Sequence, residues 1–100
     1  MDRLQLQTNL EELLGSRNVY YQPPENVKMN YPAIVYSKSN LKTTFANGNL
    51  YSKKTLYEIV VIDRRPDNPV IEKIMSLPYC KYGRHYITEG LYHDVLNLYL

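Results

Sequence analysis

The chain has 100 residues and a formal net charge of +2, and its length is that of one compact domain. Hydrophobic residues make up 44% of the chain and charged residues 22%, a composition that excludes an intrinsically disordered protein. The small positive charge indicates no particular class of partner, because nucleic-acid binding needs a clustered basic face rather than a slight excess.

The first predicted element is a helix from Arg3 to Leu14. Leu6, Leu10, Leu13 and Leu14 recur at helical spacing, and Gly15 supplies a stop. Tyr20 and Tyr21 then form a short extended segment, which the double proline at positions 23 and 24 ends. Residues 22–32 are expected to form a surface loop.

Two strands are predicted in the middle of the chain, at residues 33–37 and 55–63, because both are short apolar runs rich in β-branched residues. The polar connection between them, residues 38–54, contains Asn47-Gly48, which is a strong signal for a tight turn. We interpret the whole as a long β-hairpin with an extended and partly mobile tip.

A second helix is expected after a break at residues 63–67. Asn68 is suited to capping it, Pro69 to its first position, and its apolar face runs to Leu77 before Pro78. Residues 82–88 and 91–100 then form two strands joined at Glu89-Gly90. The order of elements predicts one α+β domain spanning residues 1–100, with a mainly antiparallel twisted sheet and two helices packed on one face.

The candidates for catalysis and metal binding are weak. Cys80, His85, His93 and Asp94 are residue types that bind metals, but they lack the spacing of known zinc motifs. His85 and His93 are expected to face each other across the last hairpin. Cys80 with His85 lacks the signature of a cysteine nucleophile. The sequence therefore predicts no enzyme, no cofactor and no metal site.

An acidic group, Asp63, Asp67 and Glu72 with Lys73, is of the kind that holds Mg²⁺ in nucleases. The Glu-x-Lys pattern expected on the core strand is missing, and a turn followed by a helix cap explains the aspartates better. There is also no glycine-rich phosphate loop.

Nucleic-acid binding is the alternative function. The chain has 11 Tyr, 1 Phe and no Trp, and tyrosine rings can stack on bases while Lys and Arg meet phosphates. The best candidate is the segment from Tyr79 to Tyr86, which mixes Tyr with Lys81 and Arg84. Tyrosine is equally a residue of protein interfaces and of ordinary strands, so its abundance leaves these interpretations open.

Three segments carry a resemblance to a known family: NVYYQPP at 18–24, YPAIVY at 31–36, and SLPYC through YIT at 76–88. In these segments, and in the order of its elements, the chain resembles the tail-terminator and head–tail joining proteins of long-tailed bacteriophages. The resemblance implies a virion protein, built in the host cytoplasm, whose copies form a ring, commonly of six, with no catalytic residues. Its implied partners are the tail tube protein and a head-completion or connector protein, and no membrane.

The long hairpin is the candidate partner-binding element, because residues 38–54 exceed what joining two strands requires. The residues expected to make contact are Lys38, Lys42, Phe45, Asn47, Lys53 and Lys54. No acidic residue interrupts these lysines, so the hairpin would present positive charge to an acidic partner. The alternative is that the lysines only keep an exposed hairpin soluble and discourage edge pairing.

Overall fold

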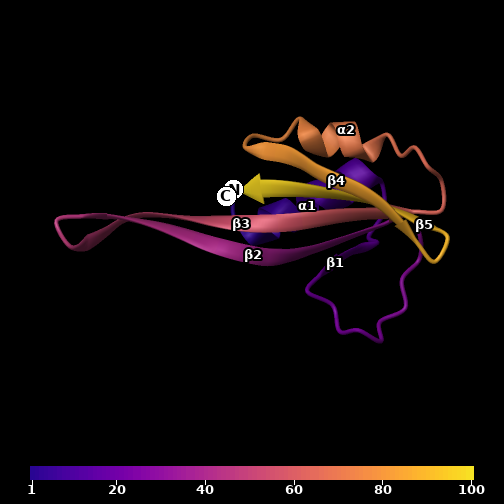
Figure 1. Cartoon of the computed structure of the whole chain (residues 1–100), viewed down its shortest axis with the longest axis horizontal. Helices are drawn as coiled ribbons and strands as arrows, with labels where there is room; N and C mark the ends of the chain where they lie inside the picture. Colours follow the sequence, from indigo (N-terminus) through magenta and orange to yellow (C-terminus); the bar gives the residue numbers. More distant parts are fainter.

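The computed structural model describes all 100 residues. Its elements in chain order are α1 (Arg3–Leu14), β1 (Val19–Tyr21), β2 (Ala33–Ala46), β3 (Asn49–Asp63), α2 (Val70–Met75), β4 (Cys80–Thr88) and β5 (Leu91–Tyr99). The strands form one sheet in the order β1-β2-β3-β5-β4, in which only β1 and β2 run parallel (Figure 1). The predicted α+β class, with a mainly antiparallel sheet and two helices, is confirmed.

The core lies between the two helices and one face of the sheet. Because side chains alternate between the faces of a strand, every second residue of β2, β3 and β5 points toward the helices. One cluster of 12 buried residues fills this layer. Its members are Leu6, Leu10, Val19, Ile34, Tyr36, Tyr57, Ile59, Val61, Val70, Ile74, Leu96 and Leu98.

Helix α1 begins and ends as its sequence predicts. The Asp2 side chain accepts a hydrogen bond from the Gln5 backbone, and the Gln5 side chain accepts one from the Asp2 backbone, which together form a capping box. Gly15 ends the helix in the left-handed conformation, with φ of 80°. Leu6 and Leu10 are fully buried, so the predicted apolar face is the face that packs on the sheet.

A tyrosine cluster joins α1 to the sheet. The rings of Tyr21 and Tyr36 lie 4.9 Å apart, and Tyr57 completes the group. The Tyr36 hydroxyl donates to Gln7 and accepts from Arg3, whose guanidinium also lies over the Tyr21 ring. Burial raises the pKa of Tyr36 and of Tyr57, so both rings stay neutral and act as core residues with a polar handle.

The two strands of the central hairpin are longer than the sequence predicts. Strands β2 and β3 pair from Ala33 opposite Ile62 to Ala46 opposite Asn49, so residues 38–54 are strand except for the turn itself. Asn47 and Gly48 have φ of 53° and 79°, the conformations of a type I′ turn. This turn twists in the same sense as its strands, which lets the pairing continue to the tip.

The remaining differences are small. Strand β4 begins at Cys80 rather than Tyr82, and α2 ends at Met75 rather than Leu77. Asn68 accepts a hydrogen bond from the Val70 backbone, but Pro69 rather than Asn68 occupies the N-cap position, and α2 begins at Val70 rather than at Pro69. Shifts of two residues at element ends follow from fraying and leave the architecture unchanged.

Candidate functional site

The outer part of the β2–β3 hairpin is a two-stranded ribbon that leaves the sheet. Pairing of β1 with β2 ends at Tyr36, and pairing of β5 with β3 ends at Leu56. Beyond these points the two hairpin strands pair only with each other, apart from contacts near the base with Gln22, Tyr79 and Leu100. They extend well past the rest of the protein (Figure 1). The longest dimension of the molecule is 51 Å, against 29 and 24 Å for the others. We call residues 40–55 the ribbon.

The base of the ribbon is positively charged. Lys42 lies directly opposite Lys54 in the register, and Lys53 projects from the other face next to Lys54. No acidic residue occurs between Lys38 and Tyr57. Like charges placed opposite each other destabilise a strand pair. The isolated ribbon is therefore electrostatically unfavourable and would gain from a negative partner surface.

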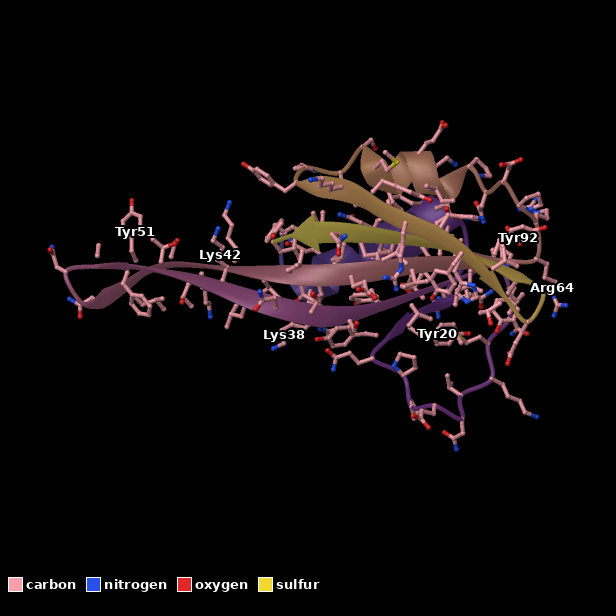
Figure 2. All side chains as sticks on the ribbon, viewed as in Figure 1. Tyr20, Lys38, Lys42, Tyr51, Arg64 and Tyr92 are labelled. Carbon is pink, nitrogen blue, oxygen red and sulfur yellow. The ribbon has the colours of Figure 1, made fainter.

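Apolar side chains are exposed beyond the lysines. Phe45, Leu50 and Tyr51 are 64%, 56% and 75% exposed. Phe45 lies opposite Leu50, whereas Tyr51 has no partner in the register because a bulge falls at this point. Figure 2 shows Tyr51 and Lys42 extending from the same side of the ribbon. Exposed aromatic residues such as Phe45 and Tyr51 are typical of a surface that contacts a protein.

The structure brings together five of the six predicted contact residues on the ribbon. Lys42, Phe45, Lys53 and Lys54 point outward from it, and Asn47 serves the turn through its positive φ. Lys38 lies apart, opposite Tyr57 and within the body of the sheet. The base of the ribbon is fixed by Lys54, whose ammonium lies 4.7 Å from the centre of the Tyr79 ring.

Leu50 and Tyr51 were missing from the predicted set. The sequence signal for Leu50 is its distance from the Asn47-Gly48 turn, because a two-residue turn fixes the register and places Leu50 opposite Phe45. Tyr51 follows Leu50 in the chain and is left unpaired by the bulge, which the sequence does not signal.

A hollow of about 690 Å³ lies at the far end of the molecule from the ribbon. It is bounded by the segment that follows β3, by α2, and by strands β4 and β5. The lining residues are Pro66, Asp67, Asn68, Pro69, Ile71, Glu72, His85 and Asp94. Three of these eight residues are acidic, and Asp67 and Glu72 are exposed.

Asp94 is the buried member of this group. Its Oδ1 atom accepts a hydrogen bond from the Tyr82 hydroxyl at 2.6 Å and lies 3.0 Å from Nδ1 of His85. The hydrogen bond to Asp94 raises the pKa of Tyr82 to about 12. Asp94 thereby ties the edge strand β4 to β5 through two side chains.

The expectation that His85 faces His93 is wrong. The two-residue turn at Glu89-Gly90 places His85 opposite Asp94, and Tyr86 opposite His93. The two histidines therefore lie on opposite faces of the sheet, and the His93 ring stacks on Tyr86 at 4.6 Å.

Changing Asp94 to asparagine is expected to lower the pKa of Tyr82 toward 10, because the carboxylate that favours the protonated phenol is lost. In the wild-type protein the raised pKa adds stability that is fully present below pH 10 and is lost as the pH rises through about 12. NMR titration of tyrosines carrying a ¹³C label, with Tyr82→Phe to assign the signal, measures both proteins. An unchanged Tyr82 titration in the Asp94→Asn protein would contradict this assignment.

Other chemical candidates are accounted for by local structure. Burial raises the pKa of the Cys80 thiol, the opposite of the shift that activates a nucleophile. Asp63 accepts hydrogen bonds from the backbone and side chain of Arg65 and from Asn68, which fixes the turn after β3. No group of three or more His, Cys, Asp and Glu residues is arranged to hold a metal ion.

The tyrosines between residues 79 and 86 do not form one surface. Tyr82 lies opposite Leu96, on the face that the helices cover, whereas Tyr86 lies opposite His93 on the other face. The extra residue at Gly83 causes this change, because a bulge shifts the register of the strand by one. A stacking platform for successive bases needs rings on the same face, so this segment does not provide one.

The sequence matches no protein-family model and no curated protein. Neither helix has the length or the apolar character needed to cross a membrane.

Proposed function

We propose that the chain is a structural virion protein of a long-tailed bacteriophage. In this role its copies form a ring at the tail end or neck, which terminates the tail tube and joins it to the head connector. The observation that carries the proposal is the ribbon, a paired extension of the sheet that presents lysines and apolar side chains away from the core. The resemblance found in the sequence supports the same role.

The ribbon is suited to assembly for a physical reason. A two-stranded ribbon on its own is only marginally stable in water, because it has no third strand or helix on which to bury its side chains. Its apolar residues and its two unpaired backbone edges gain most when a neighbouring protein covers them. A protein that works alone has no use for such an extension, whereas a joining protein needs a contact that reaches beyond its own body.

The partners in this proposal are further copies of the chain, with six in the ring, the tail tube protein, and a head-completion or connector protein. The protein is made in the host cytoplasm and ends in the virion. Its work consists of contacts between proteins, without a catalytic step or a cofactor. The ribbon lysines favour acidic patches on these partners.

Imaging of the native particle tests this function. We expect density for this fold in several copies related by rotation about the tail axis, because a repeated contact between different surfaces closes into a ring. Single copies without rotational symmetry, or absence of the chain from purified particles, would contradict the proposal.

Nucleic-acid binding is a second candidate, favoured by one observation. The ribbon places Lys42, Lys53 and Lys54 near the exposed rings of Phe45 and Tyr51, a combination that also suits single-stranded nucleic acid. Titration with DNA and RNA at increasing salt distinguishes the two functions, since phosphate contacts weaken steeply with salt. Submicromolar binding with that salt dependence would favour this candidate over the structural one.

A further inference from the structure

The ribbon is left without a partner within its own chain, and its charge restricts which surface can cover it. Contact between the ribbons of two copies would bring together six lysines, counting Lys42, Lys53 and Lys54 from each. Like-charge contacts of this kind oppose binding. A symmetric dimer built from two ribbons is therefore disfavoured.

Pairing of the ribbon with the β4 edge of the sheet is disfavoured for the same reason. The edge strand β4 carries Lys81 and Arg84, both exposed, and a bulge interrupts it at Gly83. A Cβ atom at position 83 would lie 2.9 Å from the Val95 carbonyl oxygen, so the close approach of the backbones depends on glycine. Basic residues and bulges are features that protect an edge strand from pairing.

The hollow is acidic and partly apolar, which complements the lysines and the apolar side chains of the ribbon. It contains the exposed carboxylates of Asp67 and Glu72, and the apolar groups that line it come from Pro66, Pro69 and Ile71. Arg65, which directly precedes the lining segment in the chain, is engaged by Asp63 at 3.3 Å. Its volume of about 690 Å³ has room for several side chains from the ribbon. The surface that the ribbon's charge requires is thus present on the same protein.

The two surfaces lie at opposite ends of the long axis. Figure 2 shows Tyr51 near the tip of the ribbon at one end and Arg64, which precedes the hollow in sequence, at the other. A head-to-tail contact between opposite ends passes from each copy to the next, as a ring requires.

We propose that the ribbon of one copy docks against the acidic hollow of the next copy. Lys42 and Lys54, which lie directly opposite each other, meet Asp67 and Glu72, while Tyr51, on the same side of the ribbon as Lys42 (Figure 2), covers Pro66, Pro69 and Ile71. This contact is directional, so it produces a closed ring when the rotation between neighbours is an exact fraction of a turn. The proposal rests on the ring function proposed above and names the contact that holds the ring together.

Charge reversal with the purified full-length protein tests the contact. Sedimentation velocity over a concentration series at low salt measures self-association. Reversing the ribbon, with Lys42→Glu and Lys54→Glu, and reversing the hollow, with Asp67→Lys and Glu72→Lys, are each expected to weaken association by at least about tenfold. A protein carrying all four changes is expected to recover it, because both surfaces are then reversed.

The control and one mixture make the result specific. Lys28→Glu with Lys81→Glu changes the net charge as much as the ribbon reversal, at exposed positions outside both surfaces, and should leave association unchanged. Mixing the ribbon-reversed and hollow-reversed proteins places each negative ribbon opposite a positive hollow and each positive ribbon opposite a negative hollow, so the mixture should regain association with the two proteins alternating. Circular dichroism of each variant confirms that it is folded.

Three results would overturn the docking. One is a wild-type protein that stays monomeric at every concentration, and another is association that survives both single reversals. The third is a ribbon-reversed protein that no longer self-associates while the hollow-reversed protein still does. This result would show that the ribbon binds a surface other than the hollow. The ring function is tested separately, because particle images that lack rotational symmetry would contradict it. If the images show a symmetric ring but the charge-reversal variants associate as the wild-type protein does, only the docking contact is rejected.

Discussion

Replacing Ile59 by alanine is expected to lower the free energy of unfolding by about 2–5 kcal/mol. Ile59 is fully buried and lies in β3, between Tyr36 of β2 and Leu96 of β5. Truncation removes apolar contacts on all sides and leaves a cavity that a paired central strand cannot close. Domains of this size are stable by about 5–15 kcal/mol, so the change removes a large part of the total. Urea unfolding followed by circular dichroism measures it.

The matched control is Ile87→Ala in the edge strand. Ile87 is 59% exposed, so the same truncation removes far fewer contacts and is expected to cost less than about 1 kcal/mol. The two substitutions are chemically identical and both lie in strands. Equal costs would show that β3 is not at the centre of the core.

The elements with a buried face could be predicted from the sequence. Leu6 and Leu10 define the face of α1, and Gly15 fixes its end. The apolar runs around Ile34 and Ile59 likewise identify the centres of β2 and β3. In each case burial imposes a period on the apolar residues, and that period is readable without a structure.

The outer hairpin lacks such a face, which explains why the sequence predicts a hairpin there but not how far its strands extend. Its residues are exposed on both sides, so no alternation separates buried from solvent-facing positions. Backbone pairing and the type I′ turn at Asn47-Gly48 hold it in strand form instead. The parallel pairing of β1 with β2 also leaves no local signal, because a long loop separates the two strands.

The ribbon and the hollow also differ in how far the sequence predicts them. The lysines of the ribbon are close together in sequence, and the chain order alone identifies them. The hollow is assembled from residues 66–72 together with His85 and Asp94, which only the fold brings together. The pairing of His85 with Asp94 could still have been derived, because the two-residue turn at Glu89-Gly90 fixes that register.

Shortening the ribbon is expected to abolish assembly while leaving the fold almost unchanged. The deletion removes residues 42–46 and 49–54 and retains Asn47-Gly48, so that the turn joins Leu41 directly to Thr55. These two residues are partners in the register, and Thr55 is further held by two backbone hydrogen bonds to Leu100. None of the removed residues is buried, so the core loses little and the urea midpoint should barely move.

Assembly is measured as the yield of complete, infectious particles when the shortened protein replaces the wild-type one. The matched control exchanges a directly opposed pair, Thr44→Ser with Ser52→Thr, which keeps the length, the charge and the apolar side chains of the ribbon. We expect a normal yield from the control and none from the shortened protein, because only the latter has lost Phe45, Leu50, Tyr51 and three lysines together. If the shortened protein supports a normal yield, the ribbon is not the contact element, and its lysines serve only to keep an exposed hairpin in solution.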